Sequence, residues 1–205
     1  MAIFTVDCHD NDSYAFRSYP ALSRNQQVHQ AIIPDMSGAG SVLARRCVAC
    51  GELTRKWDEP LVGLKIKKRR YDMSITYDGV VVVSVKFRKS VEAGRVQGVR
   101  FKELPDDSDF LALDATRSVL FDWERRGTRF ENQCSHCGRY KSVIGATPVY
   151  LKAGSVVWDN EIVRTDLEFG SEDEKHPLLL CGSEAAGLLK RAGLRGLDLS
   201  PVSGT

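Results

Sequence analysis

Two short cysteine motifs limit how this chain of 205 residues can fold. Both are C-x-x-C-G units, and they occupy residues 47–51 and 134–138. Two intervening residues let both sulfurs turn toward one point, and the glycine that follows can adopt a positive φ, so that the backbone doubles back. A closed tetrahedral zinc site needs four protein ligands. We therefore predict one structural Zn²⁺ bound by four cysteines, which are Cys47, Cys50, Cys134 and Cys137.

The distance between the motifs along the chain departs from the usual pattern. Zinc ribbons separate their two knuckles by roughly 15–20 residues, whereas residues 51–133 lie between them here. The metal is therefore expected to join distant parts of the chain. His136 lies inside the second motif and is predicted to face solvent rather than to replace a sulfur. A redox C-x-x-C, separate disulfides and an iron–sulfur cluster remain alternatives.

The other cysteines and the start of the sequence bear on the cellular compartment. Cys8 and Cys181 have no partner at knuckle spacing, and we expect each to behave as a small buried hydrophobe. The apolar stretch at the start of the sequence is too short for a signal peptide, and an acidic residue follows it too early. No apolar run approaches the roughly 20 residues of a transmembrane helix. We expect a cytoplasmic protein without membrane contact, in a reducing compartment where cysteines bind metal.

Residues 71–103 and 164–203 show the same order of patterns, which suggests an internal repeat. Each has an apolar run, a helix led by a serine and a final strand, and at one fixed offset Gly98 matches Gly196. We predict an α+β fold in which two strand–helix–strand repeat units and additional strands form a single compact domain over residues 1–205. A four-cysteine zinc-ribbon-like site would tie this domain together. Coincidence of common patterns is the alternative to a repeat.

Local patterns give further expectations for individual segments. Ser84 and Ser183 are predicted to be the N-caps of the two helices, with the helices beginning near them. Pro148 to Trp158 looks like a β-hairpin. Strands or a weak helix are expected in several other apolar segments, which are 25–36 (helix), 41–44, 61–66, 110–113 and 119–121 (strands).

Two charged segments are candidate contact surfaces. The basic run at 65–70 fits either a solvated strand end or a patch for an acidic protein or a phosphate backbone. Residues 166–174 carry five carboxylates and little to bury, which indicates a solvated acidic loop or an interaction surface.

The paired motifs are similar to a known protein family. The matching residues are Cys47, Cys50, Gly51, Cys134, Cys137 and Gly138. They resemble the paralogous bacterial family named for its double C-x-x-C-G motif, whose members are described as immunity proteins of swarm-inhibition toxin–immunity systems. The pattern covers residues 41–203. The resemblance implies a cytoplasmic protein that binds and neutralises a cognate toxin domain; it transfers no catalytic residue and no toxin-contacting residue.

The sequence bears on three classes of function. We expect a binding protein and not an enzyme, because no G-x-S-x-G or P-loop motif is present and only four histidines occur. Four thiolates also leave no open metal position for catalysis. A zinc-ribbon protein that binds nucleic acid is the alternative, and the net charge of only +2 argues against it. The identity of the toxin and its contact face are not predicted.

Overall fold

The computed structural model describes residues 2–16, 46–53 and 56–202, and the predictions for 25–36 and 41–44 lie outside these ranges. With η denoting 3₁₀-helices, the elements in chain order are β1 (Ile3–Asp10), η1 (Lys56–Asp58), β2 (Met73–Ile75), β3 (Val81–Ser84), α2 (Val85–Ala93), β4 (Val99–Glu103), β5 (Phe110–Ala115), β6 (Ser118–Val119), α3 (Trp123–Arg126), β7 (Arg129–Gln133), β8 (Tyr140–Ile144), β9 (Ile162–Ser171), η2 (Glu172–Glu174), β10 (His176–Gly182), α4 (Ser183–Arg191) and β11 (Leu197–Pro201).

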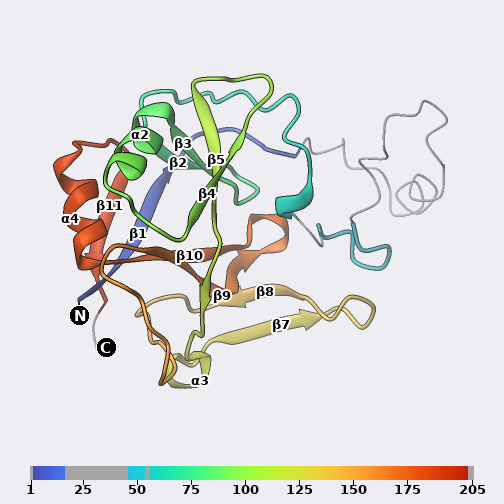
Figure 1. The fold of residues 1–205 in the computed structure, drawn as a ribbon. Helices are drawn as coiled ribbons and strands as arrows, with labels where there is room; N and C mark the ends of the chain where they lie inside the picture. The colour runs from blue at the N-terminus through green and yellow to red at the C-terminus, as the bar shows by residue number, and fades with distance from the viewer. Residues whose placement is uncertain (1, 17–45, 54–55, 203–205) are drawn as a thin grey trace.

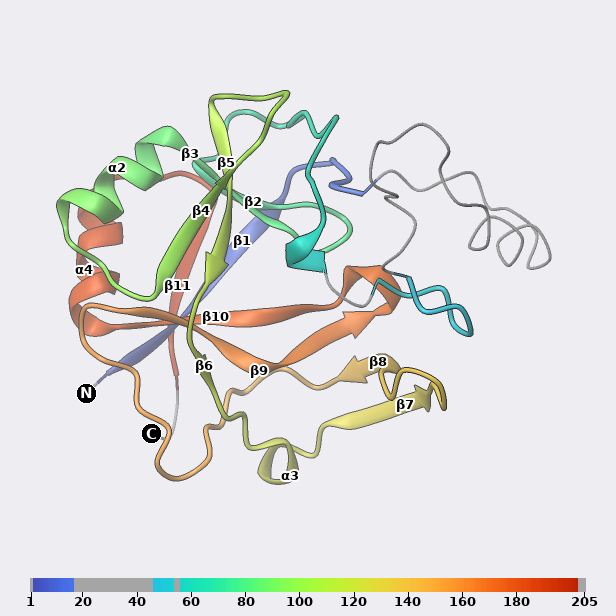
Figure 2. The same ribbon diagram turned by 45° about the vertical axis from the view of Figure 1, so that its right-hand side comes forward.

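A mixed sheet of 11 strands dominates the described residues (Figure 1). Its main path runs β4-β5-β3-β2-β1-β10-β9-β8-β7, while β11 pairs with β1 and β6 pairs with β9. Figure 2 shows α2 and α4 side by side, and these helices contact each other. The mixture of sheet and few helices agrees with the predicted class, although strands predominate.

The two strand–helix–strand segments have the same internal arrangement. In each one the helix begins directly after the first strand, and the last strand begins after a glycine with φ of +82° at Gly98 or +80° at Gly196. In each segment the first and the last strand pair with opposite edges of a third strand, which comes from outside the segment. Strand β5 pairs with both β3 and β4, and β1 pairs with both β10 and β11, all antiparallel. The N-terminal strand therefore completes the C-terminal segment.

The starts of the two long helices lie where the sequence predicts them. Ser84 is the N-cap of α2, and its hydroxyl accepts a hydrogen bond from the Phe87 amide at 3.2 Å. The N-cap of α4 is Gly182, so the prediction that Ser183 caps this helix is wrong by one residue. The carbonyl of Asp159 accepts from the amides of Glu184 and Ala185, which removes the need for a side-chain cap.

The largest apolar cluster lies between the two long helices and the sheet. It includes Phe87, Leu113 and Leu189, each at most 1% exposed. Cys181 is fully buried in this cluster, as predicted, whereas Cys8 is only partly buried and packs against it. Burial raises the pKa of both thiols to about 12, which keeps them protonated at neutral pH.

Two of the predicted strand regions are irregular because their backbone groups pair elsewhere. Strand β5 confirms the prediction for 110–113, but 61–66 is not a strand: the amides of Gly63 and Ile66 donate to side-chain carboxylates of Asp106 and Asp107. The hairpin prediction for 148–158 is also wrong. There the amide of Lys152 donates to the Leu120 carbonyl, so this segment pairs with residues 120–122 instead.

We expect Gly196→Ala to be strongly destabilising. A Cβ at this position would lie 2.5 Å from the Met73 carbonyl oxygen, in addition to the strain of its positive φ. Gly193 is the matched control, because its φ is also positive (+57°) but nothing lies within 4 Å of the point that a Cβ would occupy there. In urea unfolding, Gly193→Ala should cost about 1–2 kcal/mol and Gly196→Ala roughly 3 kcal/mol or more. Equal losses of unfolding free energy in the two variants would show that the contact with the Met73 carbonyl does not affect stability.

Candidate metal centre

The two C-x-x-C-G motifs fold into the same tight turn. In the first, the Gly51 amide donates to the Cys47 carbonyl at 2.7 Å; in the second, the Gly138 amide donates to the Cys134 carbonyl at 2.9 Å. Both glycines have positive φ, +78° and +73°, as the motif predicts. A further bond closes each turn: the first cysteine's amide donates to the carbonyl of the residue after the glycine. This local geometry turns both sulfurs of a motif to one side.

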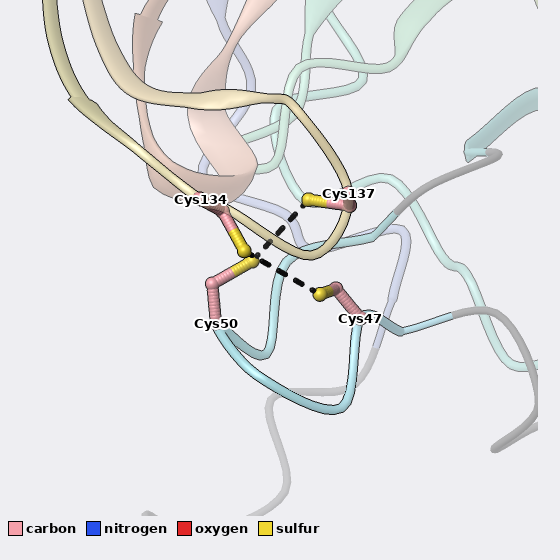
Figure 3. Close-up of side chains that lie close together, drawn as sticks. All are labelled: Cys47, Cys50, Cys134 and Cys137. Atoms are coloured by element: carbon pink, nitrogen blue, oxygen red, sulfur yellow. Dashed lines mark hydrogen bonds between the residues drawn. The ribbon is translucent and has the colours of Figure 1, made fainter.

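The two turns bring all four predicted cysteines together (Figure 3). The Sγ atoms of Cys47 and Cys134 are 3.8 Å apart, and those of Cys50 and Cys137 are 3.7 Å apart. All four sulfurs lie within 4.8 Å of one another. A tetrahedral zinc ion with Zn–S bonds of about 2.3 Å requires sulfurs about 3.8 Å apart. The cluster therefore fits a single metal ion, and His136, which is exposed, is not part of it.

The backbone of each turn favours a thiolate at the first cysteine. Hydrogen bonds from the amides of Cys137 and His136 lower the pKa of Cys134 to about 6. The corresponding amides of Cys50 and Ala49 also lower the pKa of Cys47. Thiolates are the metal-binding form of cysteine. Each turn by itself therefore favours the thiolate form that binds a metal cation.

The second cysteine of each motif has the opposite tendency. Desolvation raises the pKa of Cys50 to about 12 and also raises the pKa of Cys137. A metal ion has to displace protons from these two sulfurs, so metal binding is expected to release protons.

A buried lysine connects the segments that follow the two knuckles. Lys175 is 3% exposed, and its Nζ donates to both carboxylate oxygens of Glu52, each at 2.9 Å. Glu52 directly follows the first motif. The same ammonium also donates to the carbonyls of Tyr140 and Lys141, at the start of β8 after the second motif. One side chain therefore ties together the segments that leave both motifs.

Further ion pairs complete this support. Arg46 precedes the first motif, and its guanidinium contacts both the Asp173 carboxylate (2.8 Å) and the Gly51 carbonyl (2.7 Å). Arg139 follows the second motif and pairs with Glu168 at 2.5 Å. We call this set the knuckle clamp, which consists of Arg46, Glu52, Arg139, Glu168, Asp173 and Lys175.

The acidic segment 166–174 is not a loop, and it contributes Glu168 and Asp173 to this clamp, while Glu172 and Glu174 are exposed. Most of it is strand β9, which continues to Ser171 and is followed by η2. Glu168 and Asp173 hold arginines of the two knuckles, and Asp166 accepts a hydrogen bond from the Phe121 amide at 2.8 Å. The loop prediction is therefore wrong, because the partners of these carboxylates lie far away in the sequence.

No protein-family model matches this chain, and no curated protein matches it. The function must therefore be inferred from the site and the surface. Among the described residues, no helix has both the length and the apolar character needed to cross a lipid bilayer.

The basic run at 65–70 is partly neutralised by neighbouring carboxylates. Lys68 pairs with Asp12 at 2.8 Å, and Arg69 pairs with Asp107 at 2.6 Å. The hydrogen-bonded Asp107 raises the pKa of the Arg69 guanidinium. These pairs reduce the positive charge that the run offers to a phosphate backbone.

The clamp residues were not predicted as part of the site. Lys175 follows an acidic segment and gives no local sign of its burial. A weaker signal does exist: Glu52 and Arg139 stand at the same position, directly after each motif's glycine, with opposite charges. Their side chains lie 3.6 Å apart across the two knuckles. Opposite charges at matched motif positions could have indicated that the motifs meet.

Proposed function

We propose that this protein is an immunity protein that binds a cognate toxin in the cytoplasm and neutralises it, with a structural zinc ion at its four-cysteine site. The observation that carries this proposal is the convergence of both C-x-x-C-G motifs on one cluster. The proposal combines that geometry with the resemblance to the double C-x-x-C-G family. In this view the metal holds the fold, and the protein surface performs the function.

A structural role suits the donor set better than catalysis does. Catalytic zinc sites keep one position open for water or substrate, whereas four protein ligands close the tetrahedron. Cys47, Cys50, Cys134 and Cys137 supply four sulfurs. When bound, the ion would cross-link the two knuckles, and the clamp beneath would orient them. Thiolates also bind iron, so metal analysis of the purified protein decides between the two metals.

An exposed apolar surface next to α3 is the contact face that we propose for the toxin. We call it the tryptophan surface; it consists of Leu120, Trp123, Val156 and Trp158, which are between 38% and 53% exposed. Hydrogen bonds bring the segments that carry these residues together: the Leu120 carbonyl accepts from the Lys152 amide and from the Ser155 hydroxyl, next to Val156. Trp, Tyr and Arg are the residues most enriched in interface hot spots.

Cations on this surface indicate the charge of the partner. The Arg117 guanidinium lies 4.6 Å from the centre of the Trp158 ring, and the Lys152 ammonium lies 5.8 Å from that of Trp123. Arg125 stacks in the same way on Tyr150, at 4.3 Å. The Arg117 guanidinium is already paired with the buried carboxylate of Glu161, so Lys152 and Arg125 are the cations that this surface offers to an acidic protein face, and charge complementarity speeds capture of a partner.

The decisive experiment is co-purification with the product of the adjacent gene, followed by a test for loss of toxicity. We expect Trp158→Ala to weaken toxin binding roughly 30-fold or more, as for a hot-spot residue worth about 2 kcal/mol. Tyr14→Ala is the matched control, because Tyr14 is 51% exposed but contacts Tyr77 rather than the tryptophan surface. It should leave binding unchanged.

Two results would contradict this proposal in different ways. Equal effects of Trp158→Ala and Tyr14→Ala would remove the tryptophan surface as the contact face but leave the immunity role. Sub-micromolar, salt-sensitive binding of DNA or RNA without toxin binding would favour the alternative, a zinc-ribbon protein that binds nucleic acid. We expect no such binding at physiological salt.

A further inference from the structure

Strand β7 lies at one end of the main sheet path and has a free outer edge. It pairs with β8, and no other segment that the structure describes pairs with it. Figure 2 shows β7 at the margin of the sheet, with β8 on its inner side. An edge strand with unpaired backbone groups is a template for pairing with another chain. The residues of β7 therefore indicate which chain fits this edge.

The alternation along β7 decides which backbone groups face outward. In an antiparallel pair, every second residue exchanges hydrogen bonds with the neighbouring strand. The Cys134 amide donates to the Arg139 carbonyl at 2.8 Å, and the same register continues through β7 and β8. Phe130 therefore directs its amide and carbonyl toward β8. Arg129 and Glu131 direct theirs outward.

The two outward residues of β7 also have charged side chains without partners. Arg129 and Glu131 are both exposed, and neither makes a hydrogen bond or an ion pair with any residue that the structure describes. Phe130 lies on the opposite face of the strand. Its ring is partly exposed and lies 5.5 Å from that of Trp123 and 5.0 Å from that of Tyr140. The edge thus offers a cation and an anion on one face and an aromatic ring on the other.

We propose that β7 pairs in antiparallel fashion with β7 of a second copy of this chain, around a two-fold axis at Phe130. In this register Arg129 lies opposite Glu131 of the second copy, and Glu131 lies opposite Arg129 of that copy. Each of these pairs exchanges backbone hydrogen bonds and brings opposite charges together, which stabilises a sheet. The Phe130 rings of the two copies meet on the other face, at a position where cross-strand side chains approach closely. Such a contact is self-complementary, as a two-fold dimer requires.

Other registers of β7 are less favourable. An axis at Glu131 places the carboxylates of the two copies opposite each other, and an axis at Arg129 does the same with two guanidinium groups. Beyond Glu131 the strand is interrupted at Asn132, whose φ is +56°, and α3 ends shortly before Arg129. The pairing is therefore limited to residues 129–131, which predicts a weak dimer.

Strand β4, at the other end of the sheet path, does not have this self-complementarity. The Thr116 amide donates to the Gly98 carbonyl at 2.8 Å, so Val99 and every second residue after it direct their backbone groups outward. Every register that joins these outward groups over more than one pair places Arg100 or Lys102 opposite one of the same two cations in the second copy. Like charges opposite each other destabilise a sheet. The proposed dimer therefore uses β7, and it goes beyond the proposed immunity role without depending on it.

The test is sedimentation of the full-length, metal-loaded protein over a range of concentrations up to about 1 mM. We expect a reversible dimer with a dissociation constant of roughly 10–100 μM, as suits a small interface. Arg129→Glu should weaken it at least about tenfold, because the two-fold axis turns two attractive pairs into two repulsive ones. The double variant Arg129→Glu with Glu131→Arg restores opposite charges and should restore the dimer. Lys89→Glu, on the exposed surface of α2, makes the same change of charge and should have no effect.

Hydrogen exchange provides a second measurement. The amides of Arg129 and Glu131 should exchange more slowly as the protein concentration rises, whereas that of Phe101 on the β4 edge should not change. The proposal is overturned if the protein stays monomeric up to about 1 mM, or if Arg129→Glu and Lys89→Glu have the same effect. Failure of the double variant to recover the dimer also overturns it. Protection of the β7 amides only after addition of a toxin would show that β7 accepts a toxin strand instead of a second copy.

Discussion

Cys50→Ser is expected to remove the bound zinc and destabilise the fold in one step. Wild-type protein should contain about one zinc per chain, as a single tetrahedral site requires, and the variant should contain almost none. The ion joins two turns that are far apart in the sequence, so it restricts the unfolded chain in the way that a cross-link does. A disulfide that closes a loop of about 100 residues is worth about 4.7 kcal/mol in the chain-entropy model.

We expect a comparable loss of unfolding free energy here, on the order of 3–5 kcal/mol, since metal-binding energy appears as folding energy. For a domain of this size that corresponds to a fall in Tm of roughly 6–20 °C. A strong chelator should lower the Tm of the wild type to that of the variant. Metal analysis and thermal unfolding measure both effects.

Cys8→Ala is the control for this experiment. Cys8 lies outside the cluster, so the variant should keep its full zinc content. The zinc site is refuted if the wild-type protein is metal-free and melts at the same temperature with and without chelator. Iron in place of zinc would preserve the four-cysteine site but change the metal.

Lys175→Met is expected to cost roughly 3–5 kcal/mol, because it removes both hydrogen bonds of the buried Glu52 carboxylate to a cation and leaves Arg139 beside it at 3.6 Å, beyond hydrogen-bond distance. The carbonyls of Tyr140 and Lys141 would also lose their shared donor. These groups connect the two knuckles, so the variant should also bind zinc more weakly. Urea unfolding and competition with a zinc chelator measure the two losses separately.

The double variant Glu52→Gln with Lys175→Met shows whether the lost stability comes from the broken ion pair or from the loss of side-chain packing. If the cost comes from an unpaired buried charge, neutralising Glu52 should recover part of the lost stability, and the double-mutant cycle should show strong coupling. Lys89→Met, on the surface of α2, is the control and should change little. Additive effects of the two clamp substitutions would show that the ion pair is unimportant for stability.

The cysteine cluster could be predicted because its geometry is set locally. The spacing within each motif and the positive φ of the following glycine produce the turn, whatever surrounds it. A tetrahedral metal ion needs four ligands and each turn supplies two sulfurs, so the two turns are expected to lie together. The helix starts near Ser84 and Ser183 were also predictable, since a serine before an amphipathic run is a local signal.

The charged segments were misread because charge pairing depends on distant partners. Residues 166–174 contain carboxylates that look solvent-exposed, yet Asp173 bonds to Arg46 across the fold. Lys175 and Glu52 are likewise remote in sequence and fully paired in space. A sequence identifies which side chains are charged but contains no local information on where each one finds its counter-ion.

The sequence by itself determined which four cysteines form the cluster and where the two long helices begin, because these depend on residue spacing and hydrophobic period. Only the tertiary structure decided that β1 completes the C-terminal segment and that Glu168 and Asp173 of the acidic segment pair with the arginines beside the two knuckles. Each of these depends on contacts between residues far apart in the chain. Such contacts form only when the whole sheet has formed, since the conformational entropy lost on ordering each segment is offset by its burial against the others.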